Sequence, residues 1–102
     1  MIDAEKTRRE LMRWVILLSL HHGSPNFVYE ELILSTVQGV ISDATSLELR
    51  RHLDYLADRG LVDLTKEPSG HWHADLTRDG TDVVEYTVNC DPGIARPTKY
   101  WK

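Results

Sequence analysis

Histidine and aspartate side chains alternate along one short segment of the sequence, and both types can bind a metal ion. His71, His73 and Asp75 stand two residues apart, a spacing that places two imidazoles and a carboxylate on one face of a strand. The sequence identifies no fourth ligand and no residue that would orient the histidines. Its single cysteine, Cys90, excludes a multi-cysteine zinc site. We therefore interpret the segment as an exposed strand and expect no metal site and no cofactor.

The sequence lacks the patterns that usually mark a catalytic site. Cys90 lies between Asn89 and Asp91, with no identifiable base to activate its thiol. It contains no phosphate-binding glycine loop, paired-carboxylate motif or serine–histidine signature. We expect that the protein is not an enzyme.

The segment 45–64, TSLELRRHLDYLADRGLVDL, contains the clearest structural pattern, a helix followed at once by a strand. Thr45 and Glu48 form a capping-box pattern, in which the hydroxyl accepts a backbone amide and the carboxylate reaches back to the cap amide. Gly60 can adopt the left-handed conformation that ends a helix. The pattern predicts a helix over about 46–59 with one buried face, formed by Leu49, Leu53 and Leu56.

Length and charge limit what this helix can belong to. A chain of 102 residues suffices for one hydrophobic core, and 41% hydrophobic with 27% charged residues is typical of a soluble domain. The absence of a long apolar run and the single cysteine favour a cytoplasmic protein that does not span a membrane. The net charge of −4 disfavours strong nonspecific binding to nucleic acid, although residues 1–20 carry four basic and three acidic groups.

The remaining elements are predicted from periodicity and from breaks. An apolar repeat predicts a helix over about 3–20, and a second helix is expected over about 28–38 with Asn26 as its cap. Alternation predicts a hairpin, with strands around Val62–Leu64 and Trp72–Leu76 joined by the turn Glu67-Pro-Ser-Gly. Thr77 is expected to cap a closing helix that runs to about Tyr86. We predict a domain over 1–88 and an extended tail over 89–102.

The order helix, helix, helix, strand, turn, strand, helix resembles the winged helix-turn-helix, an α+β fold with a two-stranded wing and a short closing helix. The segments LRRHLDYLADRGLVDL and HWHADLTRDGTDVV are similar to the third helix, wing and closing helix of ArsR- and MarR-type bacterial regulators. ArsR-type metal sensors carry a cysteine pair near the third helix, which this chain lacks. The tail, DPGIARPTKYW, is similar to the ends of small winged-helix proteins of Mu-like prophages.

The resemblance implies a DNA-binding transcriptional regulator whose third helix, about 46–59, reads the major groove of double-stranded DNA. Arginine pairs bidentately with guanine, leucine touches the thymine methyl group, and serine contacts phosphate or a base edge. The implied DNA-binding residues of the helix are Ser46, Leu47, Arg50, Arg51 and Tyr55, and those of the wing are Lys66, Ser69 and His71. Alternatively, the i, i+4 spacing of Arg50 from Asp54 and of Arg51 from Tyr55 indicates two arginines on a solvated helix face.

The tail suggests a second class of function. Two prolines favour an extended backbone, so its side chains either fold back over the same domain or lie across a second copy. The alternative function is a protein–protein interaction adaptor of phage or prophage origin, without DNA binding, that uses the tail residues Ile94, Arg96, Tyr100 and Trp101. We also predict a homodimer formed through the first helix and the tail.

Overall fold

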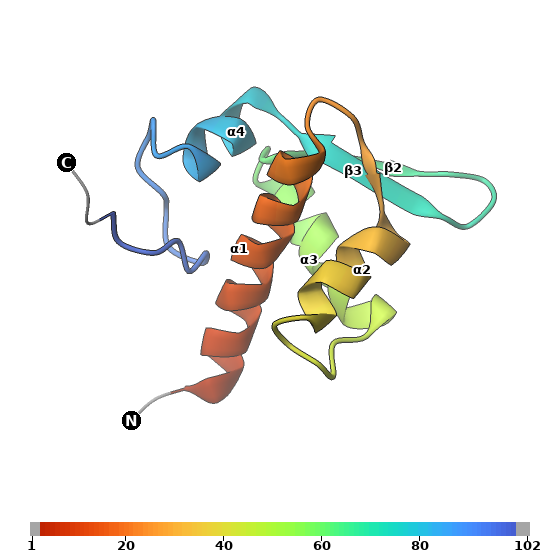
Figure 1. Cartoon of the computed structure of the whole chain (residues 1–102), viewed down its shortest axis with the longest axis horizontal. Coiled ribbons are helices and arrows are strands. Elements are labelled where there is room, and N and C mark those ends of the chain that lie inside the picture. Colours follow the sequence, from red (N-terminus) through yellow and green to blue (C-terminus); the bar gives the residue numbers. More distant parts are fainter. Residues whose placement is uncertain (1–2, 100–102) are drawn as a thin grey trace.

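The computed structural model describes residues 3–99, in which the first three helices lie on one side of a small antiparallel sheet and the short last helix lies beyond one end of it (Figure 1). The chain order is α1 (Ala4–Gly23), β1 (Val28–Tyr29), α2 (Glu30–Gln38), α3 (Ser46–Asp58), β2 (Val62–Lys66), β3 (Trp72–Leu76) and α4 (Arg78–Val84). α1 lies at the centre, with α2 and α3 on one side and the C-terminal segment on the other. This is the predicted α+β winged helix-turn-helix, in which β2, β3 and their turn form the wing.

α1 continues three residues beyond its predicted end, through His21, His22 and Gly23. Its first turn is capped by Asp3, whose carboxylate accepts a hydrogen bond from the amide of Lys6 at 3.1 Å. The apolar run from Trp14 to Leu17 is buried, as its lack of polar side chains predicts. No helix in the described part of the chain is long and apolar enough to cross a membrane.

The start of the second helix was predicted wrongly. Val28 and Tyr29 form the strand β1, which pairs with β3 so that Val28 lies opposite Ala74. α2 therefore begins at Glu30, and Tyr29, not Asn26, occupies the cap position. The sheet has three strands in the order β1-β3-β2, one more than the sequence predicted.

α3 forms as its sequence predicts. The Thr45 hydroxyl accepts a hydrogen bond from the amide of Glu48 at 3.2 Å, and Gly60 has φ +74° after the last turn. The carboxylate of Glu48 does not complete the capping box, because it accepts two hydrogen bonds from Arg8 of α1. The inward face of α3 lies in the hydrophobic core, where its fully buried side chains are Leu49, Leu53 and Leu56.

The wing turn and the closing helix are held by three local contacts. The turn forms over Glu67–Gly70, since the Gly70 amide donates to the Glu67 carbonyl at 2.9 Å. Thr77 caps α4 by accepting from the Gly80 amide at 3.1 Å. Gly80 lies directly against the carbonyl of Leu61, so only glycine fits there. α4 ends at Val84, two residues before the predicted end.

The described part of the tail, residues 89–99, folds back along α1. Ala95 donates a backbone hydrogen bond to Glu10 at 3.1 Å, and Ile94 is buried with 7% exposure. Arg96 donates to the carbonyls of Val83 and Val88. Of the two predicted arrangements, these residues adopt the one that covers their own domain; Tyr100 and Trp101 lie outside the described residues.

Candidate nucleic-acid interface

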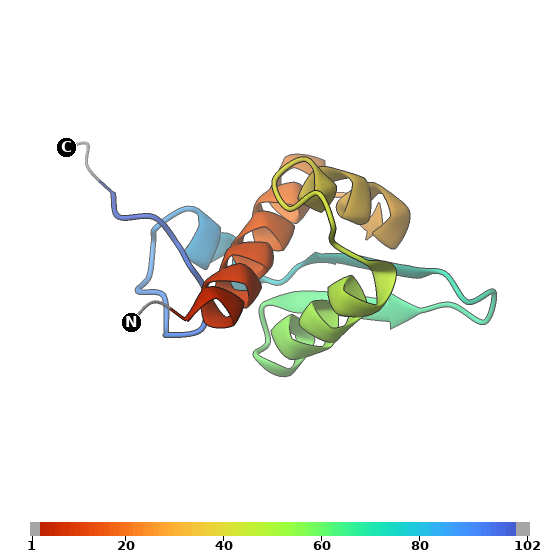
Figure 2. The same ribbon diagram turned by 90° about the horizontal axis from the view of Figure 1, so that it is seen from below.

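The N-terminal half of α3 presents a mixed polar and apolar surface to solvent. Ser46, Leu47 and Arg51 are exposed, and Leu47 keeps 63% of its surface accessible. Figure 2 shows α3 between the wing and the N-terminal half of α1. All three predicted DNA-binding residues are therefore open to solvent, with Ser46 beside the wing turn and Arg51 beside α1.

Three carboxylates near this surface are paired with basic residues of other elements. Arg8 of α1 donates to Glu48 at 2.8 and 2.9 Å and to Asp43 at 2.8 Å. Its hydrogen bonds lower the pKa of both carboxyl groups. Asp54, six residues after Glu48 in α3, forms an ion pair of 3.0 Å with Lys66 of the wing. The negative charge of the α3 surface is thereby reduced.

Arg50 joins three parts of the molecule instead of extending into solvent. Its guanidinium donates to the Glu30 carboxylate at 2.7 and 2.6 Å and to the Gly70 carbonyl at 2.7 Å, and it lies 4.5 Å from the ring centre of Trp72. Glu30 is 5% exposed and also accepts the Trp72 amide at 2.8 Å. The bonds from Arg50 are the main cause of the lowered pKa of Glu30, which burial opposes.

Tyr55 is half-buried on the other side of α3. The guanidinium of Arg13 lies 3.5 Å from its ring centre, and its hydroxyl contacts Arg59 and lies next to Gly93 of the tail. The structure therefore places this predicted DNA-binding residue beneath the tail, apart from Ser46 and Leu47.

The three wing residues named from the sequence have partners within the wing or in neighbouring helices. Lys66 pairs with Asp54 and lies 4.5 Å from the Trp72 ring. The Ser69 hydroxyl donates to Glu67 at 3.2 Å. His71 Nδ1 lies 2.7 Å from a carboxylate oxygen of Glu31 in α2, and this hydrogen bond raises the pKa of His71.

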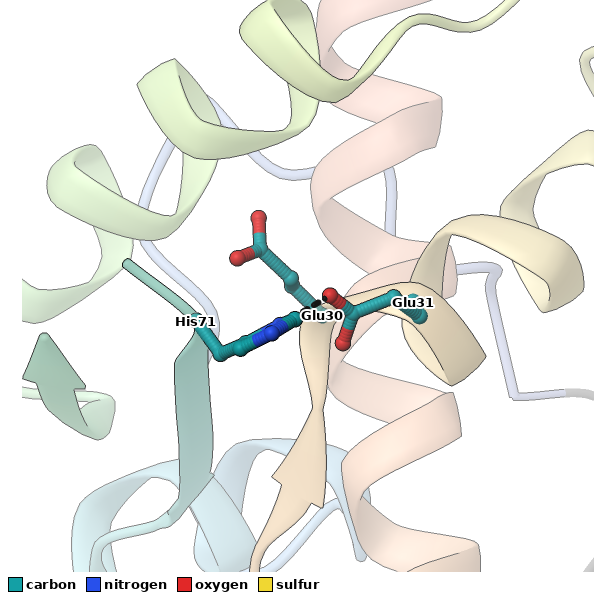
Figure 3. A group of neighbouring side chains, drawn as sticks. All are labelled: Glu30, Glu31 and His71. Carbon is teal, nitrogen blue, oxygen red and sulfur yellow. Dashed lines mark hydrogen bonds and ion pairs between the residues drawn. The ribbon is translucent and has the colours of Figure 1, made fainter. Parts of the chain in front are cut away.

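Among residues 3–99, Glu30, Glu31 and His71 form the one group of three or more potential metal-ligating side chains, with ligand atoms within 4.8 Å of one another. In Figure 3 the imidazole of His71 points at the carboxylate of Glu31. Both oxygens of Glu30 already accept hydrogen bonds from Arg50. A divalent cation would have to displace this guanidinium, so the arrangement fits an ion-pair network better than a metal site.

His73 and His71 contact different residues. Its Nε2 lies 3.2 Å from Glu67, and its ring stacks on Phe27 with 3.9 Å between ring centres. The two imidazoles that the sequence places on one strand thus have different carboxylate partners.

A basic groove lies between α1 and α3 and was not predicted from the sequence. It has a volume of about 640 Å³ and is lined by Glu5, Arg8, Arg9, Arg13, Glu48, Arg51, His52 and Tyr55. Four arginines against two glutamates leave an excess of two positive charges, in a protein whose net charge is −4. The i, i+4 spacing of Arg9 and Arg13 predicts that they lie on one face of the first helix. It does not predict that residues of α3 lie beside them, because this depends on how the two helices pack.

Solved structures confirm the fold. H. salinarum RosR is similar with a TM-score of 0.65 and 22% identity, over 74% of this chain and 67% of the RosR chain. Bordetella bronchiseptica BpsR, whose DNA binding is regulated by 6-hydroxynicotinic acid, is similar with a TM-score of 0.61 and 18% identity, over 84% of this chain and 60% of the BpsR chain. No protein-family model and no curated protein matches the sequence.

Proposed function

We propose that this chain is a small DNA-binding transcriptional regulator that reads the major groove with the N-terminal half of α3. The observation that carries the proposal is the exposure of Ser46, Leu47 and Arg51 along α3, where Glu48 and Asp54 are both paired with basic side chains. Unpaired carboxylates there would repel the phosphates of DNA, and these pairs reduce that repulsion.

The contacts assign different roles to the two adjacent arginines. Arg51 is exposed and forms no ion pair with any residue of 3–99, so its guanidinium is available to pair with guanine. Leu47 is suited to the methyl group of thymine and Ser46 to a phosphate or base edge. Arg50 instead fixes the wing relative to α2 and α3, through Glu30 and Gly70.

The fold comparisons support this proposal. BpsR binds DNA, and this chain shares its fold over 84% of its length. At 18% identity, this similarity supports only the arrangement of the helices and the wing. The residues proposed to contact DNA bases are chosen from the exposed side chains described above.

The proposal is tested by selecting bound duplexes from random-sequence DNA and measuring their affinity by fluorescence anisotropy. We expect one enriched sequence, bound more weakly as salt rises. Arg51→Ala should weaken binding to this sequence by about 1–3 kcal/mol, roughly 5- to 150-fold. Arg78→Ala, at the exposed first position of α4, is the matched control and should leave the affinity unchanged. Selection without enrichment, or equal effects of the two substitutions, would contradict the proposal.

A homodimer is part of the same proposal, because two copies would place two α3 helices on successive half-sites. Its expected surface is α1 with the tail. The adaptor alternative also used the tail, but Ile94 is buried and Arg96 is bonded to carbonyls of its own domain. These contacts hold Ile94 and Arg96 within their own domain, so they favour neither the adaptor nor a dimer contact through these two side chains.

A further inference from the structure

Arg13 is a half-buried cation whose contacts are all with neutral groups. Its Nη1 donates to the Gly93 carbonyl at 2.9 Å, its Nε donates to Nδ1 of His52 at 3.3 Å, and its guanidinium stacks on the ring of Tyr55. Among residues 3–99 no carboxylate forms an ion pair with it, although Arg8, Arg50 and Arg59 each have at least one. The charge of Glu10 acts on Arg13 without forming an ion pair, while burial disfavours the cation. An anion from outside the chain would therefore stabilise this position.

The residues around Arg13 add further positive charge to the groove. Arg9 and Arg51 also line the groove, are exposed, and have no carboxylate partner within the described residues. His52 is 7% exposed, and burial together with the charge of Arg13 lowers its pKa to about 4. The imidazole is therefore neutral near pH 7 and accepts the hydrogen bond from Arg13 without supplying a charge. Of the two glutamates in the groove, Glu48 is already bonded to Arg8.

We propose that the groove between α1 and α3 binds a phosphate group through Arg13, Arg9 and Arg51. A guanidinium donates two parallel hydrogen bonds to phosphate oxygens, and Arg13 is already held in position by Tyr55, His52 and Gly93. Arg9, Arg13 and Arg51 supply positive charge that no carboxylate pairs within residues 3–99, and about 640 Å³ is ample room for a phosphate dianion.

Phosphate has two sources, the backbone of DNA and a small phosphorylated molecule. Arg51 belongs both to this groove and to the exposed face of α3, so a DNA strand lying beside α3 would bring a phosphate to the groove. This DNA source depends on the proposed function. Binding of free phosphate does not, so the two are tested separately.

The test follows the side-chain Nε–Hε signal of Arg13 by NMR during titration with inorganic phosphate, with chloride keeping the ionic strength constant. We expect a saturable shift in the intact chain. Arg9→Gln and Arg51→Gln should each weaken phosphate binding about tenfold or more, because each removes a charged hydrogen bond. These exposed, unpaired side chains can be changed without disturbing the core, whereas Arg13→Gln would also alter the tail contacts. Arg78→Gln on α4 is the control and should have no effect.

The second arm repeats the titration with a short DNA duplex. A shift with inorganic phosphate that Arg9→Gln and Arg51→Gln weaken establishes the site, whether or not DNA binds. A shift of the Arg13 signal with DNA alone, weakened by the same substitutions, establishes the DNA backbone as the source. No shift with either probe, or the same affinity in the Arg9→Gln, Arg51→Gln and Arg78→Gln variants, would overturn the proposal.

Discussion

Removal of Glu30 should destabilise the domain more than removal of any carboxylate on its surface. Glu30 stands at the first position of α2, yet its side chain is 7% exposed. It accepts three hydrogen bonds, two from Arg50 of α3 and one from the amide of Trp72 in β3. One carboxylate thus joins α2, α3 and the wing, and Glu30→Ala would leave a guanidinium and a backbone amide without their acceptor.

The expected cost follows from this geometry. Breaking a fully buried ion pair by removing one partner costs about 3–5 kcal/mol. The side chain of Arg50 is 35% exposed, so water replaces part of the lost interaction, and we expect about 2–3 kcal/mol for Glu30→Ala. For a domain of this size the melting temperature should fall by roughly 10–20 °C.

A double-mutant cycle separates the pair from the effects of each side chain alone. The free energy of unfolding in urea is measured for the original chain, Glu30→Ala, Arg50→Ala and the double variant. We expect a coupling energy of about 1.5–3 kcal/mol. The control is the Asp54–Lys66 pair, whose side chains are 50% and 52% exposed; its coupling should stay below about 1 kcal/mol.

The result that would refute this reasoning is a Glu30–Arg50 coupling no larger than that of Asp54 and Lys66. The pH dependence provides a second check. Arg50 lowers the pKa of Glu30, so the stabilisation is complete above the usual value of 4.5 and is lost as the pH falls through the lower pKa of the folded state. The stability difference between the original chain and Glu30→Ala should therefore shrink only below pH 4.5.

Three further predictions concern other parts of the molecule. Gly80→Ala should destabilise the domain by about 1–3 kcal/mol in urea unfolding, because the added methyl group overlaps the Leu61 carbonyl; an unchanged stability would contradict this contact. His52 has a folded pKa of about 4, against an ordinary 6.5, so protonation favours the unfolded chain. Stability should fall by about 2–3 kcal/mol between those pH values, and His52→Gln, which keeps an acceptor for Arg13, should reduce this slope. The proposed homodimer predicts association in sedimentation experiments, and a strict monomer at high micromolar concentration would contradict it.

Features that depend on neighbouring residues in the sequence were predicted correctly. The Thr45 cap, the buried leucines of α3 and the stop at Gly60 all lie within one helix and its ends. The period-two wing segments formed the hairpin for the same reason, because its strands are joined by a short turn. Such features can be predicted without knowing how the rest of the chain folds.

Features that depend on distant partners could not be predicted. β1 has two residues and forms only because β3, more than forty residues later, lies beside it. The expected position of Arg50 beside Asp54 on a solvated helix face was wrong for the same reason. Its spacing suggested Asp54 of the same helix as partner, yet Glu30 accepts its hydrogen bonds and Asp54 pairs with Lys66. A helical repeat identifies neighbours within the helix but not the side chains that the fold brings against it.

The two sides of α3 differ in how their charges are balanced, and the functional proposals depend on this difference. Towards the wing, Arg50 and Lys66 are each paired with a carboxylate. Towards α1, Arg13 and Arg51 have no such partner within residues 3–99, and Arg8 binds the nearby Glu48. The net charge of −4 does not show this arrangement, because a sum over the chain does not record where its charges lie. The unbalanced positive charge lies on the α1 side of α3, so an anionic partner should approach there, with the wing already held in place by Arg50.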